Sequence, residues 1–332
     1  MEKVLILGGG GWGTALAIVL SRGGHDVRVW GRDPEYMAHL EERRENPKFL
    51  PGVMIPPGIR FGSDVEELAQ GAATHVSVVP TQFLRATLGG LRARMPSPKV
   101  IVSCSKGLET STLRRPSEIL AELWPQARGV VLSGPSHAEE VSRGLPTTVV
   151  AAATDPEAAR HTQRVFGGDR CFRTYTGSDP VGVEIGGVSK NIVAIAAGIA
   201  DGLGFGDNTR AGLMTRGLRE MTRLGVRLGA KEETFAGLSG IGDLIATCTS
   251  EHSRNRTVGF RVGAGERLTD ILRSTEKVAE GVATTQAFHR LGEQLGVNLP
   301  IMQEVHAVLF EDKPPRKAVE SLLARESGEE IG

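Results

Sequence analysis

The sequence EIGGVSKNIVAIAAGIAD, residues 184–201, is the stretch from which the rest of the chain is best interpreted. Its apolar residues do not alternate with a period of two, and Lys190 is the only charge between the two terminal acids, so we predict a helix buried on most sides. The stretch is too short and too rich in glycine to span a bilayer. Gly186, Gly187 and Gly198 each lower helix propensity by about 1 kcal/mol, which indicates that another backbone or a ligand packs closely against them.

The lysine in this predicted helix has two explanations. The stem of Lys190 can pack on apolar surface while its ammonium group reaches water. Alternatively, the side chain points into a cleft, where burial and neighbouring charges adjust its pKa for proton transfer. The stretch alone leaves both explanations open.

Composition limits the classes of function. The 332 residues predict two domains, and the balance of 39 Lys+Arg against 39 Asp+Glu gives no basic field for nucleic acid or an anionic membrane. Cys104, Cys171 and Cys248 lie far apart, and the histidines form no HExxH motif, so we predict neither a disulfide framework nor a metal site. The first residues lack a signal-peptide pattern, and we expect a cytoplasmic protein.

The N-terminal residues match a dinucleotide-binding pattern. Val4–Leu7 predicts a buried strand, a helix follows to about Ser21, and Val27–Trp30 predicts a second strand. The glycine frame between the first strand and the helix is weak evidence alone, because 43 glycines make a chance match common. Its place between a strand and a helix favours binding of a pyrophosphate. The frame is Gly8-x-Gly10-x-x-Gly13.

The end of the second strand bears on cofactor choice. Arg32 stands where an acidic ribose ligand is usual, and an arginine there can pair a 2′-phosphate. Asp33 complicates this interpretation, although it precedes Pro34 and could simply cap the next helix.

The alternation of strands and helices continues to residue 180. Polar or glycine-rich clusters follow the strands, where open α/β sheets bind ligands. Lys106 is therefore better placed than an average surface lysine, and it either contacts a ligand or lies free at the surface. Gly177–Pro180 predicts a boundary between domains 1–180 and 181–332. The further strands are predicted at 75–79, 100–103, 130–133, 147–152 and 172–175.

The second domain is predicted to be all-α, with two loops of interest. Asp243 begins an apolar helix and is either a helix cap or a site residue. Residues 253–256, SRNR, are predicted to form a turn that either binds an oxyanion or is merely solvated. Helical segments are predicted at 183–200, 208–228, 231–237, 243–249, 269–275, 283–295, 300–311 and 316–325.

These residues together resemble the bacterial-type NAD(P)-dependent glycerol-3-phosphate dehydrogenases. The resemblance covers nearly the whole chain in order, and the set of motifs is more specific than any one of them. It is carried by GGGGWGTALA (8–17), SKGLE (105–109), SGPSHAEEV (133–141), GGVSKN (186–191), DGLGFGDN (201–208), GLSGIGDLIATCTS (237–250) and SRNR (253–256).

The resemblance implies a fold and an activity. The fold is an α/β, Rossmann-type doubly wound domain followed by an all-α domain similar to the C-terminal domain of 6-phosphogluconate dehydrogenase. The activity is the reversible reduction of dihydroxyacetone phosphate to sn-glycerol 3-phosphate with NADPH or NADH, which supplies glycerophospholipid synthesis. A homodimer is the family expectation for assembly.

The resemblance also implies site residues. Lys190 takes the place of the catalytic lysine, Asp243 would hold it, and Lys106 would add positive potential at the substrate oxygens. Besides the fingerprint glycines, cofactor contacts are implied at Gly11, Trp12, Arg32, Lys106, Ala138, Arg254, Val278 and Glu280. Substrate contacts are implied at Lys106, Gly134, Ser136, Lys190, Asp243, Ser253, Arg254 and Asn255.

Two departures from the family pattern are small: Gly10-Gly11 stands where a serine is frequent, and Ser136 where threonine is common. Two rival functions remain. One is another two-domain dehydrogenase that acts on a hydroxy acid or a sugar acid. The other is a dinucleotide-binding redox sensor without turnover, which would need no buried lysine in the second domain.

Overall fold

The apolar runs of the first half pair into one eight-stranded sheet in the computed structural model, which describes residues 1–274 and 280–326. The order is β10-β9-β8-β7-β6-β1-β2-β5, and the strands from β8 to β5 are parallel, as in a Rossmann-type sheet. The strands are β1 (Lys3–Leu7), β2 (Asp26–Trp30), β5 (Arg60–Gly62), β6 (Thr74–Ser77), β7 (Val100–Ser103), β8 (Arg128–Ser133), β9 (Thr147–Ala152) and β10 (Phe172–Gly177).

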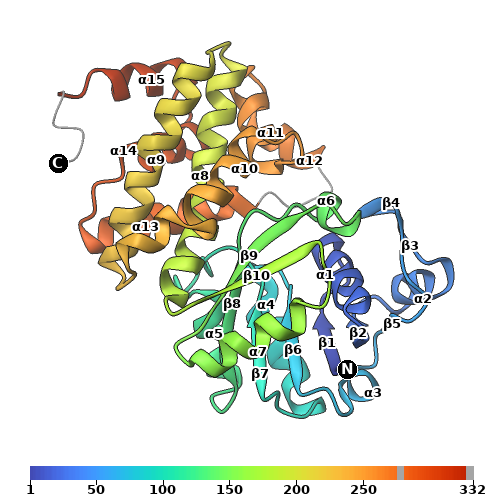
Figure 1. Ribbon diagram of the computed structural model, residues 1–332. Coiled ribbons are helices and arrows are strands. Elements are labelled where there is room, and N and C mark those ends of the chain that lie inside the picture. The colour runs from blue at the N-terminus through green and yellow to red at the C-terminus, as the bar shows by residue number, and fades with distance from the viewer. Residues whose placement is uncertain (275–279, 327–332) are drawn as a thin grey trace.

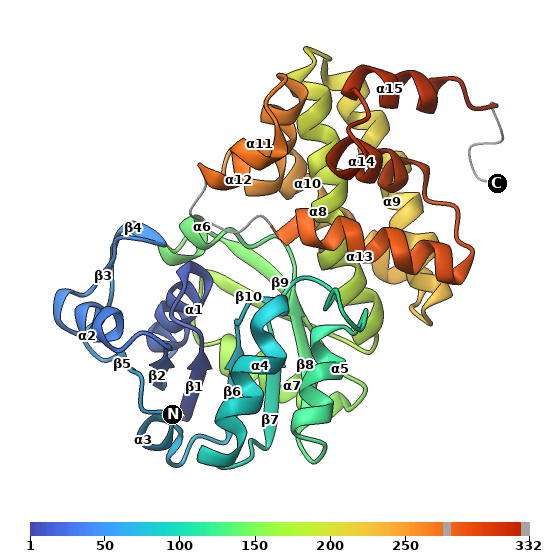
Figure 2. The same cartoon turned by 180° about the vertical axis from the view of Figure 1, so that it is seen from behind.

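Helices cover both faces of this sheet, as Figures 1 and 2 show from opposite sides. Apolar side chains of α1 and α7 share one core with the sheet, and those of α3, α4 and α5 share another. The predicted doubly wound architecture is therefore confirmed. The helices are α1 (Gly11–Arg22), α2 (Pro34–Arg43), α3 (Val65–Ala69), α4 (Thr81–Leu91), α5 (Pro116–Leu123), α6 (Ala138–Ser142) and α7 (Pro156–Phe166).

The last two strands run against the others. The short helix α6 between β8 and β9 packs on α1 and does not cross the sheet, so the chain re-enters the sheet from the same edge and β9 pairs antiparallel with β8. Strands β1, β6, β7 and β8 therefore end at one edge of the sheet, whereas β9 and β10 end at the opposite edge.

The sequence analysis missed the chain between α2 and α3. Residues 60–62 form the edge strand β5, and a hairpin of β3 (Glu45–Asn46) and β4 (Leu50–Met54) lies outside the main sheet. These strands are short, and β5 carries an arginine and a glycine in three residues, so hydrophobic periodicity cannot reveal them.

The predicted buried helix is α8 (Pro180–Gly202), which passes from the sheet into the helical part (Figure 1). At 23 residues it is longer than the predicted stretch, and by length and composition it could cross a membrane. Its most apolar window is nevertheless completely buried inside the protein, so α8 is the core helix that the sequence predicts.

Close packing at glycines fixes the neighbours of α8. A Cβ at Gly186 would lie 2.5 Å from the carbonyl oxygen of Ser239, and one at Gly198 would lie 2.1 Å from that of Arg256. Gly259 of α11 (Arg254–Gly263) approaches the backbone of α8 equally closely, at Ile195. The prediction that another backbone packs closely is confirmed for Gly186 and Gly198, whereas Gly187 lies against the side chain of Ser133. The backbone packing positions both α11 and the segment before α10.

The second half is helical wherever the structure describes it, and no strand follows Gly177 in residues 178–274 or 280–326. Residues 254–263 were missed as a helix, because their charged start resembles a solvated turn. Residues 238–242 form an irregular helical turn, broken at Gly240, that leads into α10. The remaining helices are α9 (Asp207–Arg227), α10 (Asp243–Thr249), α12 (Leu268–Arg273), α13 (Glu280–Leu295), α14 (Pro300–Phe310) and α15 (Pro315–Leu323).

Candidate active site

Lys190 lies in the middle of α8 and is buried, with 5% of its surface exposed. Its ammonium group donates hydrogen bonds to the carboxylate of Asp243 and, at 2.7 Å, to the hydroxyl of Thr247. The ammonium is therefore paired inside the protein, and the explanation that it reaches into water is wrong. A buried lysine with a carboxylate partner is the arrangement in which a pKa can be adjusted for proton transfer.

Asp243 is the first residue of α10 and only 2% exposed. It makes no side-chain capping hydrogen bond, so the interpretation as a helix cap is wrong. Its second carboxylate oxygen accepts a hydrogen bond from Lys106 Nζ at 2.8 Å, across the boundary between the sheet and the helices. Asp243 thus holds one lysine from each part of the molecule.

Thr247 was not among the predicted site residues. Its hydroxyl accepts from Lys190 Nζ and donates to the backbone carbonyl of Asp243 at 2.6 Å. A helical spacing of four places the two residues on one face of α10, and this was the available signal. The hydroxyl fixes the orientation of the ammonium group.

Burial and charge act in opposite directions on this cluster. Burial lowers the pKa of Lys190 to about 8; Asp243 opposes this shift and Lys106 adds to it. Burial alone would raise the pKa of Asp243, but the two lysines outweigh it and hold that pKa below its ordinary value. The carboxylate therefore stays ionised, while Lys190 can gain or lose a proton near neutral pH.

Lys106 is positioned by the loop that follows β7. Ser105 donates from its hydroxyl to the carbonyl of Val79 at 2.6 Å, which ties the loop to the end of the neighbouring strand. Gly107 has a φ of 149°, and a Cβ there would lie 2.8 Å from the hydroxyl of Thr81. The loop therefore turns sharply after Lys106 and directs its partly exposed side chain toward Asp243.

The segment 253–256 is the start of α11 and not an isolated turn. The hydroxyl of Ser253 caps the helix by accepting from the backbone N–H of Arg256. Asn255 accepts from the backbone N–H of Gly281 at 3.0 Å, which joins the starts of α11 and α13. Arg256 pairs with Asp201 at 2.7 Å, so its guanidinium is engaged in an ion pair within the protein.

The charge of Arg254 acts on the same buried carboxyl group as the charges of the two lysines. Burial raises the pKa of Glu280, the first residue of α13, and the positive charges of Arg254, Lys106 and Lys190 oppose that shift. These four groups are therefore close enough to interact electrostatically. A helix N-terminus beside an arginine is suited to an oxyanion such as phosphate.

The glycine loop after β1 fits a dinucleotide. Gly8 has a φ of 128°, and a Cβ on Gly13 would lie 1.9 Å from the carbonyl oxygen of Gly8, so both positions require glycine. At Gly10, by contrast, no described atom lies within 4 Å of where a Cβ would be, which leaves room for a pyrophosphate to approach the backbone. The loop opens directly into α1, whose N-terminus favours negative charge.

Gly11 has less space for a side chain than the serine that is frequent in the family would need. A Cβ on Gly11 would lie 2.7 Å from the carbonyl oxygen of Phe49, which precedes β4. A serine here would require that loop to shift. Trp12 is partly buried and packs on the core of the sheet.

Arg32 and Asp33 follow β2 and are both exposed. The carboxylate of Asp33 accepts a hydrogen bond from the backbone N–H of Tyr36 at 3.1 Å and caps α2. The ambiguity in the sequence is thereby resolved in favour of the cap, and Arg32 remains at the strand end where a ribose or its 2′-phosphate would lie.

The loop after β8 supplies the other implied contacts. Gly134 has a φ of 144°, and Ser136 donates to its carbonyl oxygen at 2.9 Å. Ala138 begins α6 and packs partly on the core of the sheet. His137, which the sequence analysis did not consider, lies 3.4 Å from the carbonyl of Ala246 in α10 and connects this loop to the helix of Asp243. Val278 lies outside the described residues.

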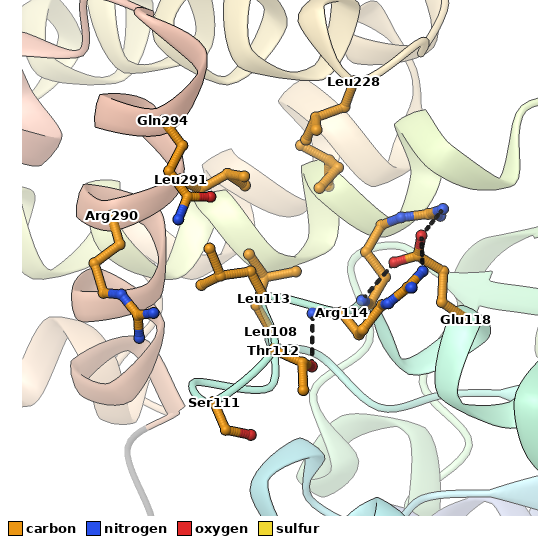
Figure 3. Close-up of a pocket in the computed structure, with 12 residues that line it drawn as sticks. Leu108, Ser111, Thr112, Leu113, Arg114, Glu118, Leu228, Arg290, Leu291 and Gln294 are labelled. Atoms are coloured by element: carbon orange, nitrogen blue, oxygen red, sulfur yellow. Dashed lines mark hydrogen bonds and ion pairs between the residues drawn. The ribbon is translucent and has the colours of Figure 1, made fainter.

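A cavity of about 380 Å³ is lined by other residues, which Figure 3 shows. It is bounded by α13, by the end of α9 and by the loop that follows Lys106, and it contains none of the residues predicted for the site. Arg115, at its edge, is paired with Glu184 and Glu118. Lys190 is the candidate for proton transfer, because its charge can change near neutral pH, whereas the guanidinium groups of Arg114, Arg115 and Arg290 at this cavity keep theirs.

Comparison with known proteins identifies related chains. The family model for the N-terminus of NAD-dependent glycerol-3-phosphate dehydrogenase matches residues 3–159, and the model for its C-terminus matches residues 179–320. A glycerol-3-phosphate dehydrogenase (NAD(P)+) from Geobacillus kaustophilus is 50% identical over 333 residues, which cover 100% of this chain and 97% of the relative. One from Geobacter sp. (strain M21) is 47% identical over 98% of this chain and 97% of the relative.

A solved structure shares the whole fold. The glycerol-3-phosphate dehydrogenase of Coxiella burnetii superposes with a TM-score of 0.92 at 36% identity. The superposition covers 97% of this chain and 98% of that protein.

Proposed function

The chain belongs to the NAD-dependent glycerol-3-phosphate dehydrogenase family, and we propose that Lys190 is the group that exchanges the proton in its reaction. The protein is an NAD(P)-dependent oxidoreductase that interconverts dihydroxyacetone phosphate and sn-glycerol 3-phosphate. We propose in addition that this reaction supplies glycerophospholipid synthesis.

The observation that carries the proposal is the buried Lys190, whose pKa is lowered to about 8. Bound NAD(P)H supplies the hydride. As the carbonyl of the substrate gains negative charge, Lys190 as ammonium donates a proton to the oxygen, and in the reverse direction its free amine accepts one. Asp243 and Thr247 hold the ammonium group, and Lys106 adds positive potential beside the developing alkoxide.

The phosphate of the substrate is assigned to the start of α11. Arg254 and the N-terminal N–H groups of the helix offer charge-assisted hydrogen bonds, and Ser253 and Asn255 flank them. Gly134 and Ser136 line the opposite side, on the sheet. An anchored phosphate would hold the ketone in the orientation that the reaction needs, so that the energy of phosphate binding lowers the activation barrier.

The cofactor is assigned to the edge of the sheet at β1 and β2. Gly8, Gly10, Gly11, Trp12 and Gly13 would hold the pyrophosphate. Further cofactor contacts are proposed at Arg32, Lys106, Ala138, Arg254, Val278 and Glu280.

One assay tests the proposed function. Dihydroxyacetone phosphate should bleach the near-ultraviolet absorbance of NADPH with wild-type protein, and Lys190→Met should abolish the signal. Dihydroxyacetone without its phosphate is the matched substrate control and should react far more slowly. Bleaching by a keto acid in place of the triose phosphate would favour the hydroxy-acid rival. Tight NADPH binding without turnover would favour the sensor.

Cofactor preference is a separate prediction. If Arg32 pairs the 2′-phosphate, NADPH is preferred over NADH, and Arg32→Ala should weaken NADPH binding by about 1.5–3 kcal/mol while leaving NADH binding unchanged. Isothermal titration with each cofactor measures both. Equal losses for the two cofactors would mean that Arg32 contacts the adenine and not the phosphate.

We also retain the division into domains 1–180 and 181–332, a cytoplasmic location and a homodimer as proposals. The end of β10 at Gly177 and the start of α8 at Pro180 support the domain boundary. The three free cysteines suit a reducing compartment. Light scattering on the purified protein would test the dimer.

A further inference from the structure

Two histidines from neighbouring helices stack on one another in the helical part, away from the residues assigned to catalysis. The rings of His289 in α13 and His306 in α14 have centroids 3.8 Å apart and planes that differ by 9°. Two carboxylates adjoin them: Glu311 lies 3.0 Å from Nδ1 of His306, and Glu293 lies 3.5 Å from Nε2 of His289. One potential ligand atom from each of His289, His306 and Glu311 lies within 4.8 Å of the others.

The fold brings these groups together although the sequence gives no such signal. Helices α13 and α14 form a hairpin, and Glu220 of α9 fixes the start of α14 by accepting from the backbone N–H groups of Ile301 and Met302. His289 and Glu293 stand one helical turn apart on the same face of α13. The cluster therefore rests on a rigid base, with partly exposed histidines and exposed carboxylates.

Two imidazole nitrogens with one or two carboxylate oxygens form a ligand set typical of zinc and similar transition metals. Zinc–ligand bonds of about 2.0–2.2 Å in a tetrahedral site place neighbouring ligand atoms about 3.4 Å apart. The largest separation, up to 4.8 Å, therefore needs to contract by roughly 1.4 Å, whereas the 3.0 Å between Glu311 and His306 is already short enough. Rotation of the exposed carboxylates together with one imidazole ring can supply this change.

Binding of one ion by both histidines requires the stacked rings to change their relative orientation. Because the lone pair of an imidazole nitrogen lies in the plane of its ring, two parallel rings cannot both direct lone pairs at one ion, and one ring must rotate about its Cβ–Cγ bond. This torsion is soft in histidine. His289 is the ring that can turn, since its Nδ1 has no hydrogen-bond partner among the described residues and its Nε2 contacts Glu293 only loosely.

We propose that His289, His306 and Glu311, with Glu293 as a fourth ligand, bind one divalent transition-metal ion of the zinc class. The ion would join α13 to α14. It is not needed for the chemistry, since Lys190, Asp243 and Lys106 supply the charges that act there. Its effect would be to stabilise the hairpin that begins at Glu280.

The test is a zinc titration of chelator-treated full-length protein at about pH 8, where histidine is neutral, in competition with a chromophoric chelator. Wild type should bind one equivalent of Zn²⁺, and His306→Gln should lower the affinity at least about 100-fold. The exposed His39 of α2 provides the matched control, and His39→Gln should bind as wild type does. Mg²⁺ should not compete, because it prefers oxygen ligands.

A second variant and a second signal guard against misfolding of the first variant. Glu311→Gln alters an exposed side chain, cannot disturb the core, and should weaken Zn²⁺ binding about 10-fold. Co²⁺ should give the visible absorption of a four-coordinate site in wild type and lose it in His306→Gln, while turnover stays unchanged in both variants. The proposal is overturned if wild type binds no stoichiometric Zn²⁺, or if His306→Gln and Glu311→Gln bind it as tightly as wild type; the histidines would then be a packing pair only.

Discussion

Two aspartates with buried side chains, Asp243 packed against α8 and Asp201 within it, are each held between two cations. Asp243 lies between Lys106 and Lys190. Asp201, near the other end of the helix, lies between Arg210 and Arg256, each at 2.7 Å. The side chains of both aspartates are almost completely buried, so the two clusters share one electrostatic design.

The difference between the clusters is the type of cation. The pKa of a buried lysine shifts readily, and that of Lys190 is lowered to about 8 by burial, against the opposing effect of Asp243. A guanidinium does not release its proton, and hydrogen bonding to Asp201 raises the pKa of Arg210 further. The same geometry therefore gives a proton donor in one place and a permanent clamp between α8, α9 and α11 in the other.

The largest predicted effect is on Lys190. Lys190→Met retains the apolar stem and removes the proton, so turnover should fall at least about 1000-fold while NADPH affinity changes less than about threefold. Steady-state rates and NADPH binding on the same preparation measure both. A near-normal rate would mean that Lys190 contributes only packing and does not transfer the proton.

The same substitution in the two clusters should separate catalysis from stability. Asp243→Asn should lower turnover at least about 100-fold, because Lys190 loses the partner that keeps it protonated. Asp201→Asn should leave turnover within about threefold but lower the free energy of unfolding by about 2–3 kcal/mol, a value reduced for the partial exposure of both arginines. Turnover and denaturant unfolding are measured on each variant. The distinction between the two clusters is contradicted if both substitutions lower turnover, or if both lower only the free energy of unfolding.

Arg254 and Arg256, both in the first turn of α11, extend this comparison between catalysis and stability. Arg254→Ala should raise the Michaelis constant for dihydroxyacetone phosphate about 100-fold, whereas Arg256→Ala should mainly lower stability through the loss of its pairing with Asp201. Phosphite should stimulate reduction of dihydroxyacetone by wild type and not by Arg254→Ala. An unchanged Michaelis constant in Arg254→Ala would move the phosphate elsewhere, with Lys106 as the next candidate.

The sequence predicts the sheet well, because strands buried on both faces are continuous apolar runs and the glycine frame lies at a known point of such folds. It predicts Lys190 as unusual, because one charge in an apolar helix must be paired or directed outward. It cannot decide between these outcomes, since the partner Asp243 is far away along the chain and meets Lys190 only through the packing of α10 on α8.

The errors have related causes. The start of α11 resembles a solvated turn because its charged residues precede the apolar ones, and only the glycine contacts with α8 show it to be a packed helix. The local signal for Thr247 is only its spacing of four from Asp243, and the pair His289–His306 has none, since their partners are defined by tertiary structure. Asp33 shows the opposite case. The sequence left open whether Asp33 caps α2, and its hydrogen bond from the backbone N–H of Tyr36 shows that it does.

The most direct test of the account is the pH dependence of kcat/KM in both directions. Reduction needs Lys190 as ammonium, so between about pH 7 and pH 10, above the second ionisation of the substrate phosphate, it should fall about tenfold per pH unit once the pKa near 8 is passed. Oxidation needs the free amine and should rise through the same pKa. Because Asp243 raises the pKa of Lys190, Asp243→Asn should move both inflections to lower pH. A reduction rate that stays level through this range, or one that changes with pH in the same direction as oxidation, would contradict the assignment of Lys190 as the proton donor.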